Sequence, residues 1–109
     1  LYYKEDRKKG QKEGKQEEFY ESGGKKLESE FKNGKETGQW TVYFENGKVS
    51  TTFNYTDGLL NGPVVINDDK GVKIVEGNYK NGKEDGKWIF YDESGKVKKT
   101  EEYELGKKK

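Results

Sequence analysis

Four residue types are missing from this chain of 109 residues: cysteine, histidine, methionine and alanine. Without cysteine, the chain can form no disulfide, no zinc–thiolate site and no thiol nucleophile. Without histidine, it has no Ser-His-Asp triad, no imidazole metal ligand and no side chain whose ordinary pKa lies near neutral pH. No apolar run approaches the roughly 18 residues that a membrane-spanning helix needs. These absences exclude many enzyme, metal-binding and membrane-spanning arrangements.

Apolar residues are also scarce, at 28%, whereas charged residues make up 39%. Such a composition is typical of disordered chains, but these are usually poor in aromatics and carry a large net charge. Here aromatics reach 14% and the net charge is only +1. We therefore expect one folded domain over 1–109 with a shallow, extended core. Because the chain begins at Leu1, we also expect it to be a trimmed or processed piece.

Glycine is abundant and recurs with a fixed period. Thirteen of the fifteen glycines fall on three phases of a 24-residue repeat, which start at Gly10, Gly14 and Gly23, and only Gly24 and Gly77 lie outside them. A period of this length is the signature of a repeat protein. The chain then divides into a partial repeat (1–9), four full repeats (10–33, 34–57, 58–81 and 82–105) and a tail (106–109).

Each repeat is predicted to be a β-hairpin. Residues 39–44 and 49–55 are rich in aromatic and β-branched residues and flank Asn46-Gly47, which we interpret as a two-residue type I′ turn. A second loop with two glycines, as at 33–38, joins consecutive hairpins. Helix is disfavoured because each mid-helix glycine costs about 1 kcal/mol. We expect an all-β fold of about nine strands in one extended, single-layer, antiparallel up-and-down sheet, with a partial first strand at 2–6.

The predicted turn also sets the register of the hairpin. It pairs residue 44 with 49, 42 with 51, 40 with 53 and 38 with 55, so that an apolar face separates from a polar face, on which 45 pairs with 48 and 43 with 50. The same register places a glycine opposite an aromatic ring in every repeat, a known device for fixing strand register. The four pairs are Gly14–Phe31, Gly38–Tyr55, Gly62–Tyr79 and Gly86–Tyr103.

Two stretches, 33–48 and 81–96, resemble the MORN (membrane occupation and recognition nexus) repeat in their glycine spacing and intervening aromatics. The likeness is strong in the second and fourth repeats and weaker in the first and third. The period is one residue longer than in the common eukaryotic form, and Trp40 and Trp88 replace a glycine of that form. Both departures resemble the bacterial variant, which is associated in places with antitoxin components. The resemblance implies an elongated sheet of hairpins that binds a partner and has no catalytic activity.

The apolar face is the first candidate binding surface. An incompletely covered apolar face can contact a partner, although it can also serve only to pack the sheet. Two leucines in a loop that elsewhere carries Lys-Glu are a further candidate contact. The candidate residues are Trp40, Val42, Phe44, Phe53, Tyr55, Leu59, Leu60, Tyr79, Trp88, Phe90 and Tyr103.

Other residue groups give no chemical site. Asn67-Asp68-Asp69 offers too few oxygen ligands for calcium and lacks the EF-hand pattern. Adjacent carboxylates such as Glu17-Glu18 and Glu101-Glu102 point to opposite faces of a strand, so they cannot form an acid/base pair. We expect no catalytic residue, no metal and no cofactor.

A protein partner is the leading expectation, and toxin neutralisation is a narrower form of it. Open sheet edges or the aromatic face could also mediate self-association. Interleaved charges argue against nucleic-acid binding. The basic run at 107–109 offers peripheral lipid binding as an alternative, and a structural spacer in a longer array is another. The cellular compartment, cytoplasmic or exported, stays open.

Overall fold

The computed structural model describes residues 2–4, 7–8 and 11–109, and these residues form strands and turns with no helix. Eight long strands carry the four repeats as hairpins. They are β4 (Gly14–Phe19), β5 (Lys25–Lys32), β7 (Gly38–Tyr43), β8 (Val49–Thr56), β10 (Gly62–Asn67), β11 (Lys73–Lys80), β13 (Gly86–Tyr91) and β14 (Val97–Glu104). Shorter strands are β1 (Tyr2–Lys4), β2 (Arg7–Lys8), β3 (Gln11–Lys12), β6 (Lys35–Glu36), β9 (Leu59–Leu60), β12 (Lys83–Glu84) and β15 (Lys107–Lys108).

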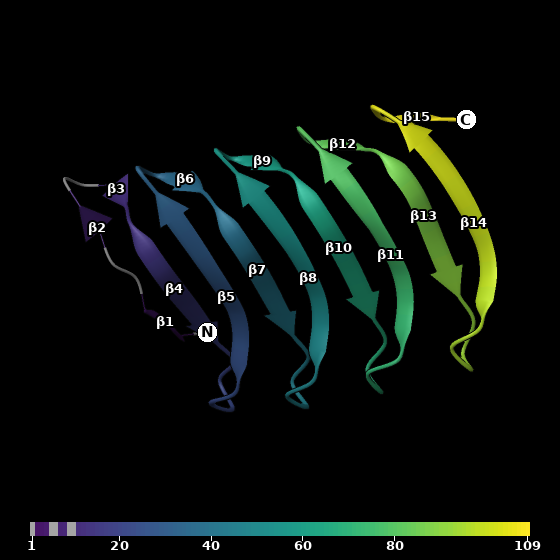
Figure 1. Ribbon diagram of the computed structural model, residues 1–109. Helices are drawn as coiled ribbons and strands as arrows, with labels where there is room; N and C mark the ends of the chain where they lie inside the picture. Colours follow the sequence, from purple (N-terminus) through teal and green to yellow (C-terminus); the bar gives the residue numbers. More distant parts are fainter. Residues whose placement is uncertain (1, 5–6, 9–10) are drawn as a thin grey trace.

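The strands form one open antiparallel sheet in chain order, which confirms the predicted up-and-down sheet of hairpins (Figure 1). Its main path runs β1-β4-β5-β7-β8-β10-β11-β13-β14-β15. The nine predicted strands correspond to β1 and the eight long strands, although positions 5–6 of the first lie outside the described residues. The 13-stranded sheet also contains the two-residue strands β6, β9, β12 and β15, while β2 and β3 form a separate pair.

The register inside each hairpin follows the predicted glycine–aromatic pairs. Gly14 faces Phe31, Gly38 faces Tyr55, Gly62 faces Tyr79 and Gly86 faces Tyr103. The pairs 42–51, 40–53 and 38–55 are likewise confirmed. These pairs match the prediction because the register shift lies between Val42 and Tyr43, next to the turn, and the rest of the hairpin keeps the register that a two-residue loop would set.

The predicted type I′ turn at Asn46-Gly47 is wrong. Gly47 has a positive φ of 89°, but Asn46 does not, and Gly47 N donates to Phe44 O at 2.9 Å. This geometry fits a type I turn closed by a left-handed glycine, which produces a bulge. The register therefore shifts after Val42, so Tyr43 pairs with Val49 and the predicted pairs 43–50, 44–49 and 45–48 do not form.

The type I′ conformation occurs instead in the loops between repeats. Both residues of Asn33-Gly34 have positive φ, 52° and 80°, and the equivalent Asp57-Gly58, Asn81-Gly82 and Leu105-Gly106 repeat the pattern. The glycine N–H of each loop donates to a carbonyl of the preceding loop; Gly58 N, for example, donates to Glu36 O at 2.9 Å. These loops thus connect neighbouring repeats along one rim of the sheet.

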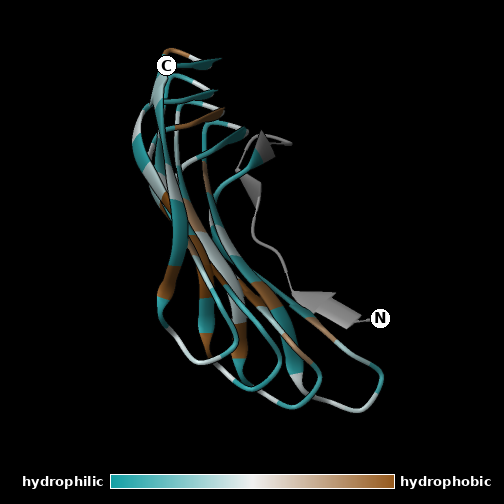
Figure 2. Cartoon of the chain, turned by 90° about the vertical axis from the view of Figure 1, so that its right-hand side faces the viewer, coloured by the Kyte–Doolittle hydropathy of each residue, from teal (hydrophilic) through white to brown (hydrophobic). Residues whose placement is uncertain are grey.

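The molecule is a single curved layer, as Figure 2 shows from the side. Its principal extents are 45 × 33 × 14 Å, so the thickness is that of one sheet with its side chains. Among the residues whose burial is described, Val64 and Trp88 are the buried apolar side chains, at 6% and 8% exposure. The core is therefore spread along one face, with no second layer packed against it.

Candidate partner-binding surface

One row of side chains runs across all four hairpins on the aromatic face. The row is built from pairs within hairpins and from the seams between hairpins, where Glu28 pairs with Thr41 and Glu76 with Ile89. Continuing the seam registers by one residue places Ser29 beside Trp40 and Gly77 beside Trp88. In order, the row is Gln16, Ser29, Trp40, Phe53, Val64, Gly77, Trp88 and Glu101.

Three aromatic rings gather around Trp40 in the first half of this face. The centroid of Trp40 lies 5.3 Å from Phe31, 6.1 Å from Phe53 and 4.9 Å from Tyr55. Trp40 Nε1 donates to Glu30 O and Thr37 O at 3.2 and 3.3 Å. All four rings are half-buried, so the cluster is held in place while part of each ring faces solvent. We call Phe31, Trp40, Phe53 and Tyr55 the Trp40 cluster.

A second cluster surrounds Trp88. Its centroid lies 5.2 Å from Tyr79 and 6.2 Å from Tyr103, both in edge-on geometry. The indole lies directly over Gly77, because a Cβ at Gly77 would stand 2.2 Å from Trp88 Cδ2. Trp88 is buried, and its Nε1 has no hydrogen-bond partner among the described residues. We call Tyr79, Trp88 and Tyr103 the Trp88 cluster.

The remaining candidate residues lie around these clusters. Val42 and Phe90 are half-buried in β7 and β13, and Lys99 Nζ sits 4.8 Å from the centre of the Phe90 ring. Phe44 begins the turn after β7. Leu59 and Leu60 lie on opposite faces of the sheet, because neighbours in a strand alternate between faces. Leu60 pairs with Tyr55 beside the Trp40 cluster, whereas Leu59 pairs with Thr56 and is 50% exposed.

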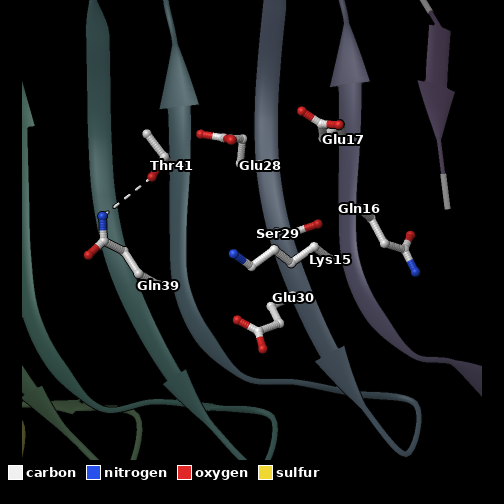
Figure 3. Close-up of a pocket in the computed structure, with 8 residues that line it drawn as sticks. All are labelled: Lys15, Gln16, Glu17, Glu28, Ser29, Glu30, Gln39 and Thr41. Carbon is white, nitrogen blue, oxygen red and sulfur yellow. Dashed lines mark hydrogen bonds between the residues drawn. The ribbon is translucent and has the colours of Figure 1, made fainter. Parts of the chain in front are cut away.

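The opposite, polar face contains a shallow hollow that the sequence analysis did not identify (Figure 3). It has a volume of about 310 Å³ and lies over β4, β5 and β7. The strand alternation predicted a polar face, but no residue pattern indicated a hollow in it. Its lining residues are Lys15, Gln16, Glu17, Glu28, Ser29, Glu30, Gln39 and Thr41, of which Gln16 and Ser29 belong to the row of the aromatic face and the other six alternate with that row.

A lysine, a glutamate and a tyrosine meet at the edge of this hollow. Lys25 Nζ contacts Glu17 Oε2 at 3.0 Å and Glu28 Oε2 at 3.1 Å, and the Tyr43 hydroxyl donates to Glu28. The hydrogen bond from Tyr43 is the main cause that lowers the pKa of Glu28, and the same bond raises the pKa of Tyr43. Lys25 shields the two carboxylates, which face each other across β4 and β5.

The same arrangement recurs 48 residues later. Lys73 Nζ contacts Glu76 Oε2 at 3.2 Å, and the Tyr91 hydroxyl donates to Glu76, which lowers the pKa of that carboxyl. Both clusters bridge a seam between repeats, β5 to β7 and β11 to β13. At the seam between them, Asn67 Nδ2 donates to Val49 O at 3.1 Å instead. These polar groups therefore tie consecutive hairpins together.

The described residues contain no group of three or more Asp and Glu side chains able to hold a metal ion. In the turn that contains Asn67-Asp68-Asp69, Asp68 Oδ1 accepts hydrogen bonds from the N–H groups of Lys70 and Val72, both at 2.9 Å. The bond from Val72 is the largest cause that lowers the pKa of Asp68. This carboxylate caps a turn. Within the described part of the chain, no helix could span a membrane.

The fold and its repeated pairs define a tandem β-hairpin repeat protein with one open sheet. The family model described as MORN repeat variant matches residues 12–33, 36–57 and 84–105, which together exceed half of the chain. The chain therefore belongs to the MORN repeat family, as the resemblance implied. The matches omit the third repeat, which has Val64 in the tryptophan position and Asn67 in the tyrosine position. Among curated proteins no match was found.

Proposed function

We propose that this protein is a non-catalytic protein-interaction module and that a partner docks on its aromatic face. The observation that carries the proposal is the Trp40 cluster, four aromatic rings held together on a sheet only one layer thick. Aromatic side chains supply much of the binding energy at protein interfaces, because they bury a large area at little conformational cost. Family membership is consistent with such a repeat-type binding role.

The polar face supports a structural role rather than acid/base chemistry. A general acid at neutral pH needs a carboxyl pKa raised toward 7, and a general base or nucleophile tyrosine needs a lowered pKa. Glu28 and Tyr43 shift in the opposite directions, because their mutual hydrogen bond stabilises the carboxylate and the protonated phenol. The hollow therefore presents a stabilised ionic cluster next to the seam.

The identity of the partner is the finer part of the proposal. A toxin is one such partner, by the resemblance to repeats associated with antitoxin components. Lipid binding gains little support from the basic terminus, because Lys108 Nζ already contacts Glu101 Oε2 at 2.9 Å. A surface built around aromatic rings also fits a protein better than an anionic membrane, which attracts clustered basic residues.

The test replaces two rings of the Trp40 cluster that face each other across β7 and β8. Trp40→Ser/Phe53→Ser should abolish partner capture from an extract of the native host while the circular dichroism spectrum of the sheet is retained. The matched control is Thr41→Ser/Thr52→Ser, which alters the adjacent cross-strand pair on the opposite face and should leave capture unchanged.

Each alternative has its own outcome. Capture that survives in a folded Trp40→Ser/Phe53→Ser variant would place the binding site elsewhere. Equal capture losses in both double variants would indicate a general effect of stability, and the aromatic face would then serve only to pack the sheet.

A further inference from the structure

Trp40 and Trp88 lie at the same place in two hairpins whose backbones match. Each is the third residue of a six-residue strand, β7 or β13. Both strands begin at a glycine with positive φ, Gly38 at 70° and Gly86 at 80°, and both follow a loop that opens on two further residues with positive φ. The backbone therefore gives the two indole rings equivalent surroundings.

Two backbone carbonyls hold the ring of Trp40, and both have counterparts in the fourth repeat. Trp40 Nε1 donates to Glu30 O at 3.2 Å and to Thr37 O at 3.3 Å. The residues 48 positions later are Asn78 and Asp85, and they repeat the bond that closes the seam: Asp85 N donates to Asn78 O at 2.9 Å, as Thr37 N does to Glu30 O. A carbonyl oxygen has two lone pairs, so Asn78 O can accept a second bond. The fourth repeat thus has acceptors in matching places for an indole N–H.

Trp88 does not use these acceptors, because its ring is displaced toward the preceding hairpin. Its Nε1 is buried and has no hydrogen-bond partner among the described residues. Its centroid is 6.2 Å from Tyr103, whereas that of Trp40 is 4.9 Å from the equivalent Tyr55. The displaced indole covers Gly77, where a Cβ would stand 2.2 Å from Cδ2. Gly77 does not have a positive φ, so the missing Cβ serves to make room for the ring.

Each of two ring positions satisfies one requirement of the indole and leaves the other unmet. Over Gly77 the ring is buried, which stabilises the sheet, but a buried tryptophan N–H without an acceptor is destabilising. In the position that Trp40 occupies, the N–H has two acceptors, but part of the ring faces solvent. Because the two effects oppose each other, the difference in free energy between the positions is smaller than either effect alone.

We propose that Trp88 exchanges between the deep position over Gly77 and a raised position like that of Trp40, and that a docked partner selects the raised one. In the raised position Nε1 donates to Asn78 O and Asp85 O. The residue beside the ring across the seam, glycine or serine, decides which position is more populated in the free chain.

The effect of a partner follows from burial. A partner that covers the aromatic face removes the raised ring from water, which offsets the exposure that favours the deep position in the free chain. The Trp88 cluster then joins the Trp40 cluster as a second contact. The exchange itself is a property of the free chain, whereas its use by a partner rests on the proposed function.

The first experiment needs no partner and follows the two indole N–H groups by NMR. Trp40→Phe leaves one indole signal and so assigns both. Relaxation dispersion, which reports motions of microseconds to milliseconds, should detect exchange at the Trp88 indole. Gly77→Ser should abolish this exchange and move the Trp88 signal downfield, toward that of the hydrogen-bonded Trp40 indole. Circular dichroism checks that the variant keeps the sheet.

Ser29 provides the reciprocal change and its matched control. Ser29→Gly removes the Cβ beside Trp40, so this ring should sink and its indole signal should move upfield. Ser29→Ala keeps the Cβ and should leave the Trp40 signal in place. A Trp88 indole without exchange, or a folded Gly77→Ser variant whose Trp88 signal does not approach that of Trp40, would overturn the two positions. A Ser29→Gly variant in which Trp40 stays raised would overturn the role of the neighbouring residue.

The second experiment measures whether a partner uses the raised position. The concentration of immobilised chain that depletes half of the captured protein from an extract of the native host should fall about tenfold or more for Gly77→Ser. This factor follows because a raised position populated at about 10% or less weakens binding by the wild type in proportion. Ser29→Ala should deplete at the wild-type concentration.

The two proposals fail in different ways. Equal depletion by the wild type and by a Gly77→Ser variant whose raised ring is established by NMR would overturn selection by the partner. Capture that survives in Trp40→Ser/Phe53→Ser would instead refute the proposed function, and the exchange of Trp88 seen by NMR would be unaffected.

Discussion

The second and fourth repeats carry the same tryptophan in the same strand position, yet the two rings pack differently. Trp40 is half-buried, and its Nε1 donates to two backbone carbonyls. Trp88 is 8% exposed, and its Nε1 is buried with no hydrogen-bond partner among the described residues. An unsatisfied buried N–H carries a desolvation penalty of about 1–3 kcal/mol, which packing must offset.

The difference originates in the neighbouring hairpin. The residue beside Trp40 across the seam is Ser29, which has the Cβ that a glycine lacks. The residue beside Trp88 is Gly77, and the indole fills the space that a Cβ would occupy. The depth of an aromatic ring on this single layer is therefore set by the size of the residue one strand away. A deeply seated ring stabilises the sheet, and a shallow ring stays available to a partner.

The largest expected effect separates the two tryptophans by stability. Trp88→Ala should lower the free energy of unfolding by about 3–5 kcal/mol, the usual cost of deleting a buried aromatic side chain. Trp40→Ala should cost clearly less, because part of its ring already faces solvent. Urea unfolding of both variants measures the difference. Equal losses, or a larger loss at Trp40, would contradict the assignment of Trp88 as the main stabilising ring.

A smaller effect is expected from closing the space beneath Trp88. Gly77→Ala should destabilise by about 1–3 kcal/mol, since the new Cβ overlaps the indole. Gly77 does not have a positive φ, so backbone strain does not contribute. Adding Trp88→Val, the residue found at position 64 of the third repeat, should make the alanine nearly neutral. Ser29→Ala is the control beside Trp40 and should change stability by less than about 1 kcal/mol. A Gly77→Ala penalty that persists in the Trp88→Val background would exclude the overlap as its cause.

Much of the fold could be predicted from the sequence, because the glycine period and the two-residue strand alternation act within one hairpin. The four glycine–aromatic pairs follow from those two regularities together with the register that a two-residue loop sets. The turn assignment was wrong because Asn-Gly occurs at both 33–34 and 46–47, and the dipeptide does not reveal how many residues close the loop.

Features that cross a seam could not be predicted in the same way. Gly77 stood out only as a glycine outside the period, and its partner Trp88 belongs to another hairpin whose register the sequence analysis did not derive. The bond from Tyr43 to Glu28 crosses a seam as well. Trp40, Phe53 and Tyr55 of the Trp40 cluster were predicted as candidate site residues. Phe31 was not, because it joins the cluster from the preceding hairpin.

The smallest expected effect concerns the polar face, where a tyrosine donates to a glutamate both at Tyr43–Glu28 and at Tyr91–Glu76. The pKa of Glu28 is lowered below its ordinary value of 4.5, chiefly by the hydrogen bond from Tyr43. A lowered folded-state pKa contributes stability above the ordinary pKa, and this contribution is lost as the pH falls from about 4.5 through the folded value. Tyr43→Phe should therefore cost less than about 1 kcal/mol at pH 7, because the cluster is partly solvated. The difference from wild type should shrink toward pH 3 in urea unfolding.

Two further tyrosine variants, one on each face of the sheet, serve as comparisons for Tyr43→Phe. Tyr91→Phe removes the equivalent bond to Glu76 and should show the same pH dependence in the same direction. Tyr55→Phe removes a hydroxyl from the aromatic face, and its effect should not change between pH 7 and pH 3, because the causes that shift the Tyr55 pKa are burial and Glu36. A pH-independent cost in Tyr43→Phe would mean that the bond stabilises the seam without favouring the ionised carboxylate. Unequal pH profiles at Tyr43 and Tyr91 would show that the two halves differ on both faces of the sheet.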